Sequence, residues 1–453
     1  MSDHLDRLAR FIHEADYEAL PESVIERAKM VLIDTVGIAI YANGRNELFA
    51  RTADFLKASC GQGASRMSRI WGVKDGLADS PFSALLNGAA AHSKQLDEAH
   101  WGAAGHPASY VVPAVLSVAE TRRLSGKEAI TGIVVGYEVA ARLGSAYKRK
   151  STMHPCGTYG IVGSAAAVGK LLKQDPQTLR ETIRLSANLT LATTASSALE
   201  GASVHDLFTG FTNFMGVLIP WLAECGFRGE TRALEMVFGT VSGDQFNPEV
   251  LTADLGTSYE IEKNFFKLHA VCGRNLSAIT AFEDLWGELG LSDRDIDHIR
   301  VETYRGAVDW CSNNAPDNEL AAKFSIPFAL SAIAVFGNLF PDVFSDEHLN
   351  HPRIRELCSR VEVAENPDMT ALIPRERPAK VTIRTKDGRE YSREVLQHAG
   401  ERDRSYSFGQ IRDKFSRITA PILGNEKSQA ILEKVGSIEN VSDINELTAL
   451  FVP

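Results

Sequence analysis

The sequence has few cysteines and no long apolar run, and these absences exclude several classes of protein. Only six of its 453 residues are cysteine, and no two of them form a C-x-x-C pair, so a zinc ribbon or a thioredoxin-type redox site is not expected. Their wide scatter is typical of the reduced cytosol rather than of a disulfide framework. No apolar stretch is long and charge-free enough to span a bilayer, and the N-terminus lacks the basic start and apolar run of a signal peptide. We therefore expect a cytoplasmic protein that has no membrane partner.

An excess of basic residues is also missing. The chain carries 48 Lys and Arg against 58 Asp and Glu, a formal net charge of −10 at pH 7. This balance argues against nucleic acid or an anionic membrane surface as the main partner. A local cluster of Lys, Arg and His can still bind an anionic metabolite.

The sequence contains no H-E-x-x-H, no P-loop and no strand-linked G-x-G-x-x-G motif, so no motif in it points to a catalytic metal or a nucleotide.

What the sequence does contain is a long series of helical patterns. Apolar residues recur at helical spacing over 24–40. Ser125-Gly-Lys-Glu128 forms a capping box ahead of a second helix, and Asp175-Pro176 supplies an N-cap and a first-turn proline for a third. Residues 85–170 are so rich in alanine and glycine that we expect a buried, closely packed helical core.

The pattern changes to that of strands near residue 295. Residues 298–304 alternate between apolar and polar side chains like a half-buried strand. Two further segments, 380–385 and 390–395, flank an Asp387-Gly388 turn, which is typical of a β-hairpin.

Helical patterns surround these strands. One is predicted over 319–336, and the tail returns to helical pattern over 407–450. The simplest arrangement is a large helical domain formed by both chain ends and interrupted by a smaller α+β insert, so the predicted fold class is mainly α. We place the helical domain at 1–263, the α+β insert at 264–399, and the C-terminal helices that rejoin the first domain at 400–453.

One segment near residue 100 holds an unusual density of groups that exchange protons near neutral pH. His92, His100 and His106 lie there with the carboxylates of Asp97 and Glu98, in a stretch otherwise rich in alanine and glycine. Small residues let the backbone approach a ligand closely, and imidazoles and carboxylates serve as acids and bases. The alternative interpretation is a helix end with solvated side chains.

Several short motifs, spread over nearly the whole length, carry a resemblance to a known family. They are Ile33–Gly37, Leu86–His92, Gly105–Pro107, Ser125–Gly126, Gly136–Val139, His154 with Gly157–Gly160, Asn264–Ala270, Ala322–Ser325 and Asp387-Gly388. In their order and spacing the chain resembles the MmgE/PrpD family, which includes 2-methylcitrate dehydratase, cis-aconitate decarboxylase and iminodisuccinate epimerase.

The resemblance implies a fold and a kind of site. The expected fold is a large all-helical domain with a smaller α+β lid, usually in a homodimer. The expected active site lies between the two domains and is built without a metal or an organic cofactor. This fold agrees with the one predicted independently from the sequence patterns.

Where many members read Asp-Phe-Asp-Asp-Thr-His, this chain reads Gln95-Leu96-Asp97-Glu98-Ala99-His100. The first acid is thus replaced by Gln95, whereas Asp97 and Glu98 remain. Adjacent carboxylates repel each other, so one of the two is able to hold its proton at neutral pH and serve as an acid. The alternative is that Asp97 caps a helix and Glu98 faces water.

Two histidines and a lysine occupy retained motifs. His106 lies in Gly-His-Pro, and His154 lies just before a helix rich in glycine and alanine. Each is a candidate general acid, general base or donor to a substrate carboxylate. Lys267 holds the family's lysine position, where an ammonium binds a carboxylate and stabilises enolate-like charge. Structural histidines and a solvated lysine are the alternatives.

Other family positions are changed. A histidine, His205, stands at a lysine position, and Leu276 replaces the histidine nine residues after the lid lysine. Trp310 falls where the decarboxylase has a tyrosine. Arg274 lies nearby and is suited to clamp a carboxylate. The predicted catalytic residues are His106, His154, Asp97, Lys267 and His205, and the predicted substrate-binding residues are Gln95, Glu98, His100, Arg274 and Trp310.

Three functions fit these residues. The first is a cofactor-independent lyase, 2-methylcitrate dehydratase-like, that removes the proton α to a carboxylate of a small di- or tricarboxylic acid. The second is an epimerase of the iminodisuccinate type, which returns the proton to the opposite face. The third is a homologue that binds a metabolite without turning it over, which the replaced positions suggest and the retained histidines argue against.

Overall fold

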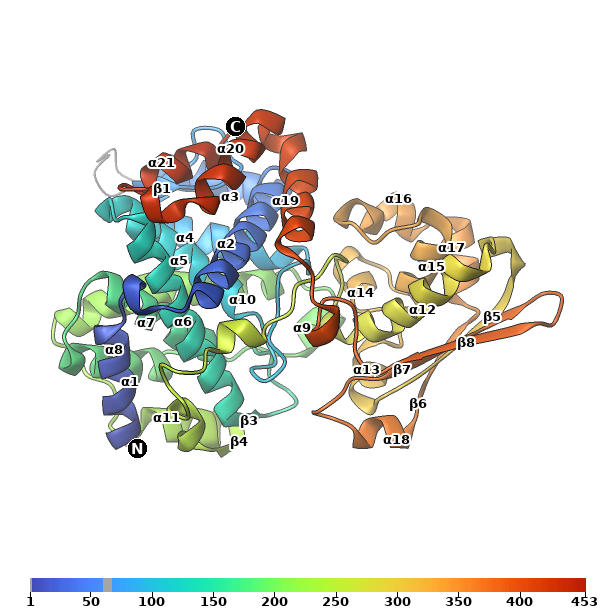
Figure 1. Cartoon of the computed structure of the whole chain (residues 1–453), viewed down its shortest axis with the longest axis horizontal. Coiled ribbons are helices and arrows are strands. Elements are labelled where there is room, and N and C mark those ends of the chain that lie inside the picture. The colour runs from blue at the N-terminus through green and yellow to red at the C-terminus, as the bar shows by residue number, and fades with distance from the viewer. Residues whose placement is uncertain (1, 60–66) are drawn as a thin grey trace.

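The computed structural model describes residues 2–59 and 67–453, so Cys60 lies outside the described residues. Two lobes stand side by side (Figure 1). The helical lobe is formed by α1–α11 with α19–α21, and the small lobe by α12–α18 with β5–β8. Both chain ends lie in the helical lobe. Most elements are helices, so the predicted mainly α class is confirmed.

The helical lobe contains most of the helices. Their bounds are α1 Ser2–Glu14, α2 Glu22–Asn43, α3 Glu47–Ser59, α4 Ser80–Ser93, α5 Pro107–Arg122, α6 Gly126–Ala146, α7 Tyr159–Leu171, α8 Pro176–Asn188, α9 Ser196–Leu199, α10 Val204–Glu224, α11 Ala233–Met236, α19 Phe408–Leu423, α20 Asn425–Gly436 and α21 Asn445–Thr448. Two antiparallel pairs complete it, β1 Met67–Arg69 with β2 Leu77–Asp79 and β3 Tyr147–Arg149 with β4 Gly243–Phe246.

The small lobe packs helices against a four-stranded sheet of order β6-β5-β7-β8. Strand β5 is parallel to β6 and antiparallel to β7, which forms a hairpin with β8. The bounds are α12 Leu276–Leu289, β5 Ile296–Thr303, α13 Arg305–Cys311, α14 Glu319–Lys323, α15 Ile326–Phe336, α16 Asp346–Leu349, α17 Pro352–Cys358, β6 Val361–Glu365, α18 Pro367–Ala371, β7 Ala379–Thr385 and β8 Glu390–Val395.

The predicted strand and hairpin are present, and one predicted helix is divided. The hairpin turns at Gly388, whose φ of +88° suits glycine. The helix predicted over 319–336 breaks between α14 and α15, because Ser325 caps the second helix by accepting a hydrogen bond from the Phe328 N–H. Pro327 lies in the first turn of α15, where its missing N–H costs nothing.

The apolar core follows the two lobes. One buried cluster draws on α1–α8 and α19–α21, and the other on the small lobe. Where α6 and α7 cross, a Cβ added at Gly163 would meet the Ala140 Cβ at 2.5 Å, so the helices approach as closely as the alanine- and glycine-rich sequence predicts. The predicted domain bounds at 263 and 399 stay predictions.

A buried ion pair joins the two ends of the chain to the segment between α4 and α5. The Lys414 ammonium of α19 donates to Asp34 Oδ1 of α2 at 2.5 Å and to the Leu96 carbonyl at 2.7 Å. The other oxygen of Asp34 accepts the Glu98 N–H at 3.0 Å. The fold therefore fixes the segment whose residues were predicted to act in catalysis.

No helix among the described residues has the length and apolarity needed to cross a membrane.

Candidate active site

Four histidines from separate segments meet in the helical lobe. His92 ends α4, His106 precedes α5, His154 lies between β3 and α7, and His205 is in the first turn of α10. The centre of the His92 ring lies 4.5 Å from the centre of the His106 ring and 5.0 Å from that of His205. The centres of the His205 and His154 rings lie 4.7 Å apart. The structure thus brings together the predicted His106, His154 and His205, and it adds His92.

The carboxylate of Asp97 lies behind two of these rings. Its Oδ2 accepts hydrogen bonds from His92 Nδ1 at 2.9 Å and from the Ser109 hydroxyl at 2.7 Å, and His106 Nδ1 lies 3.2 Å away. Burial opposes ionisation of this carboxyl, but the two imidazoles and Lys267 outweigh burial and hold the pKa of Asp97 well below its usual value. Asp97 is therefore an anion that orients and supports histidines, rather than a proton donor.

His106 has its hydrogen on Nδ1. That nitrogen lies 2.7 Å from the carbonyl oxygen of Glu98, which only accepts hydrogen bonds, so Nδ1 must carry the hydrogen. The nearby Asp97 carboxylate strengthens this choice of tautomer. In the neutral ring the lone pair is therefore on Nε2, and the side chain lines a cavity. His106 Nε2 is thus placed to act as a general base.

His154 has the opposite tautomer. Its Nδ1 accepts the backbone N–H of Cys156 at 3.3 Å, so a neutral ring carries its hydrogen on Nε2. Burial, and then the neighbouring histidines, lower the pKa of His154 well below its usual value, so the ring is neutral at pH 7. His154 lines the same cavity as His106, and it can donate the Nε2 hydrogen to a substrate oxygen.

His92 is already satisfied by the protein. Besides the bond to Asp97, its Nε2 accepts from the side-chain amide of Gln95 at 3.0 Å. Burial lowers the pKa of His92 to about 4, so the ring stays neutral. The ligand atoms of His92, Asp97 and His106 lie within 4.8 Å of one another, as in a metal site. The hydrogens on both Nδ1 atoms occupy the lone pairs that an ion would need, so these groups fit an ion poorly in this arrangement.

His205, which replaces a family lysine, is fully buried against His92 and His154. Within the described residues its Nε2 has no hydrogen-bond partner, and its Nδ1 lies 3.5 Å from Asp206 Oδ1. His205 does not line the cavity that His106 and His154 line, so its predicted catalytic role stays a prediction that the geometry does not favour.

Lys267 and Gln95 hold the wall between the cluster and the small lobe. The Lys267 ammonium donates to the carbonyls of Gln95 at 2.6 Å and Val271 at 3.2 Å, and it lies 3.7 Å from Asp97 Oδ1. Gln95 lines the cavity, whereas Lys267 is buried behind it. This placement favours a positioning role for Lys267 over the predicted direct contact with substrate, which stays a prediction.

The cavity beside the histidines lies between the lobes and is small, about 50 Å³, which is below the range typical of metabolite pockets. From the small lobe, Arg274 and Trp310 line it, and the guanidinium of Arg274 lies 4.5 Å from the centre of the Trp310 ring. Their predicted substrate-binding roles stay predictions. Further lining residues that the sequence did not single out are Ala104, Arg149, Pro155, Cys272, Gly273 and Phe324.

Two residues predicted to bind substrate lie elsewhere. Glu98 accepts the Ala108 N–H at 2.8 Å and the Tyr137 hydroxyl at 2.9 Å, and burial raises the pKa of Glu98 to about 7. His100 Nε2 lies 3.2 Å from Glu260. Neither lines the cavity, so their substrate-binding roles stay predictions that the geometry does not favour. Leu276 is buried at the start of α12.

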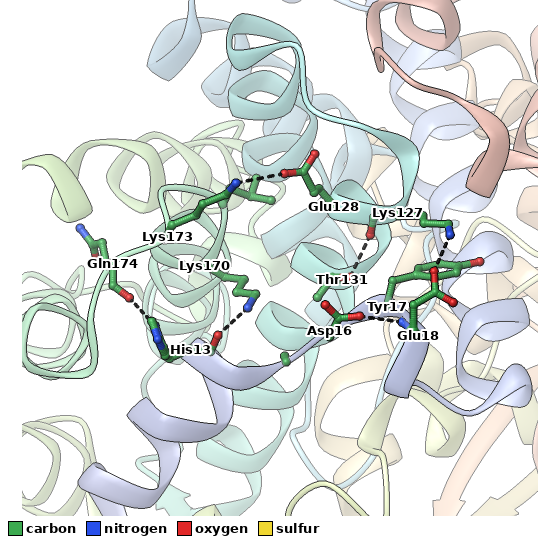
Figure 2. A pocket seen from close by; sticks show the side chains of 12 residues that line it. His13, Asp16, Tyr17, Glu18, Lys127, Glu128, Thr131, Lys170, Lys173 and Gln174 are labelled. Atoms are coloured by element: carbon green, nitrogen blue, oxygen red, sulfur yellow. Dashed lines mark hydrogen bonds and ion pairs between the residues drawn. The ribbon is translucent and has the colours of Figure 1, made fainter.

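A larger groove on the helical lobe is a poorer candidate (Figure 2). Its cations already have partners: the Lys170 ammonium donates to the His13 carbonyl at 2.7 Å, and Lys127 is paired with Glu18 (Figure 2). Lys173 lies 3.8 Å from Glu128. The groove therefore lacks the free cations and basic nitrogens that converge on the cavity between the lobes.

Comparison with known proteins agrees with the geometry. The sequence model of the MmgE/PrpD N-terminal domain matches residues 6–246, and that of the MmgE/PrpD C-terminal domain matches residues 269–440. The chain is 25% identical to cis-aconitate decarboxylase of Homo sapiens, over 98% of this chain and 94% of the relative. It is 24% identical to the enzyme of the same name from Mus musculus, over 98% of this chain and 92% of the relative.

A fungal relative shows the same relationship. Cis-aconitate decarboxylase of Aspergillus terreus is 24% identical over 95% of this chain and 92% of the relative. The similarity thus extends over both lobes. Because the two family models together match the greater part of the sequence, the chain belongs to the MmgE/PrpD family.

Proposed function

We propose that the protein is a lyase that acts on a small di- or tricarboxylic acid without a metal or organic cofactor. The proposal rests on two histidines that line one cavity and make opposite hydrogen bonds through Nδ1. His106 Nδ1 donates to a carbonyl, which leaves Nε2 as the basic nitrogen, whereas His154 Nδ1 accepts a backbone N–H, which leaves the hydrogen on Nε2. The relatives support it, because the three compared above are named as decarboxylases of a tricarboxylic acid.

The residues divide the work of an elimination as follows. His106 Nε2 takes the proton from the carbon α to a carboxylate, and the electron pair of that C–H bond forms the new double bond. His154 donates a hydrogen bond from its Nε2–H to the leaving hydroxyl group. The proton carried by the His106 imidazolium then passes to this hydroxyl group, which departs as water, and His106 returns to its neutral form. Asp97 stabilises the imidazolium that forms on His106. In a decarboxylation, the carboxylate leaves as carbon dioxide and the C–C electron pair stays on the substrate. His106 in its protonated form supplies the proton that takes the place of the carboxylate.

The second candidate is an epimerase, which the four-histidine cluster favours. His154 lines the cavity together with His106 and is packed against His205, so a second imidazole is available to return a proton to the opposite face of the substrate carbon. This reaction needs no donor for a leaving group.

Proton NMR in deuterated buffer separates the candidates. The purified protein is incubated with 2-methylcitrate, citrate, cis-aconitate or iminodisuccinate, each with and without EDTA. We expect cis-aconitate to lose a carboxylate, or one hydroxy acid to give new olefinic signals, at the same rate in EDTA. Exchange of an α-proton with an intact skeleton would instead establish the epimerase. A rate lost in EDTA would contradict a metal-free site, and no change in any sample would contradict both reactions.

We also propose that the protein is a homodimer that uses α10. The apolar side chains of Val204, Leu207, Phe211 and Trp221 are exposed along this helix, by 37% to 45%, and such a stripe is typical of a contact between copies. In size-exclusion chromatography with light scattering, the double variant Leu207→Glu/Phe211→Glu should have half the molar mass of the wild-type protein. Phe55→Glu, which changes a 67% exposed side chain on α3, should not. A wild-type protein of single-chain mass would contradict the dimer.

A further inference from the structure

The cavity between the lobes receives one arginine from each lobe. Arg149 is the last residue of β3 in the helical lobe, and Arg274 lies in the turn that leads into α12 of the small lobe. Both side chains line the cavity that His106 and His154 also line. The two arginines are far apart in the sequence, and only the fold brings them to one site.

Neither guanidinium has a carboxylate partner among the described residues. The hydrogen bonds they make are weak: Arg149 donates to the Lys150 carbonyl at 3.4 Å, and Arg274 donates to the Cys272 sulfur at 3.9 Å. By comparison, the half-buried Arg184 is paired with Glu181 at 2.7 Å. A hydrogen bond from Cys311, and then the charge of Arg274, lower the pKa of Cys272 to about 5, so the Cys272 thiolate supplies a counter-charge to Arg274. Arg149 has no such partner among the described residues. Two half-buried cations that share one cavity with a single thiolate favour an anionic ligand.

The two arginines also act on each other. Burial lowers the pKa of Arg149, and the charge of Arg274 acts in the same direction. An anion with two carboxylates would offset both the burial and the repulsion, since a guanidinium binds a carboxylate through two parallel hydrogen bonds. An acid with a single carboxylate would offset the charge of only one of the two arginines.

We propose that Arg149 determines substrate specificity by binding one carboxylate of the substrate while Arg274 binds another. This inference rests on the proposed function, because it assigns the substrate of the same site. The carbon chain between the two carboxylates would then lie beside His106 and His154, where the proton is transferred. Acids with one carboxylate would bind at one arginine only and would not be held across the histidines.

Binding of carboxylates that cannot react tests the inference apart from turnover. The probes are tricarballylate, succinate and propionate, measured by calorimetry on the wild-type protein and on Arg149→Gln, Arg149→Lys and Lys148→Gln. The last variant changes an exposed residue on the same strand. We expect Arg149→Gln to lower the affinity for tricarballylate and for succinate about 10- to 100-fold. The affinity for propionate should not change. Arg149→Lys should show an intermediate loss, and Lys148→Gln none.

The outcomes separate this inference from the proposed reaction. Arg149-dependent binding of tricarballylate without turnover of any substrate would retain the inference and overturn the lyase. Equal binding by wild type and Arg149→Gln would overturn the inference, as would the absence of probe binding to the wild type. If Arg149→Gln fails to fold, Arg149→Lys decides, because it keeps the charge and loses the two parallel hydrogen bonds. Wild-type affinity of that variant would then contradict the inference.

Discussion

Replacing His106 by glutamine is expected to lower kcat by roughly 10²- to 10⁴-fold and to leave the melting temperature nearly unchanged. Glutamine fills a similar space, and its amide N–H can still donate to the Glu98 carbonyl, which accepts from His106 Nδ1 at 2.7 Å. It has no basic nitrogen to replace Nε2. The measurement is steady-state kinetics on whichever substrate the NMR panel identifies, with a thermal melt of the same sample.

A matched variant is His269→Gln. His269 is also a partly buried histidine paired with a carboxylate, since its Nε2 lies 3.2 Å from Glu283, but it does not line the cavity. Its kcat should stay within about twofold of the wild type, because a general base contributes only where it touches the substrate. A His106→Gln enzyme with a near-wild-type rate would remove His106 from the mechanism.

The second large effect is expected for Asp97→Asn. The neutral amide keeps the shape of Asp97 but removes the counter-charge from the imidazolium that forms during turnover, so kcat should fall by roughly 10³- to 10⁴-fold. The acidic limb of the kcat/KM profile should move to lower pH, because protonation of the base becomes less favourable without the anion. A purely structural role for Asp97 would lower kcat without moving the profile.

Asp97→Asn is also expected to destabilise the fold. Lys267 is buried, and its ammonium lies 3.7 Å from Asp97 Oδ1. Removing one partner of a buried ion pair leaves the other uncompensated, which costs about 3 kcal/mol. Glu138→Gln provides the comparison, since Glu138 is a buried carboxylate 3.0 Å from Arg142 and away from the cavity. It should lower the melting temperature in the same way and leave kcat of the folded protein unchanged.

Local sequence patterns predicted most of the elements correctly. Helix α2, the β7–β8 hairpin and the caps at Ser125 and Asp175 depend on residues near one another in the chain, and all are present. The stretch predicted to be helical over 319–336 is helical but divided into α14 and α15, because its apolar pattern continues through Ser325, whose side chain caps a new helix. Apolar periodicity does not register such a break.

The candidate site was only partly predictable. Among the predicted site residues, the cavity is lined by His106, His154, Gln95, Arg274 and Trp310, and their roles stay predictions. Lys267, Glu98 and His100 were singled out by motif and spacing, yet in a loop the spacing does not say which way each side chain points. Arg149 carried no local signal, since nothing near it in the sequence marks it as facing a cavity.

The amino-acid sequence was sufficient to predict a mainly helical fold, an inserted sheet and two of the histidines that line the cavity, His106 and His154. It was not sufficient to predict which nitrogen of each histidine is free. That choice comes from hydrogen-bond partners, the Glu98 carbonyl for His106 and the Cys156 N–H for His154. The pairing of Arg149 with Arg274 likewise exists only after two lobes have packed together. Hydrogen bonds and charges act over a few ångströms in space, so distant segments must first fold against each other before these properties exist.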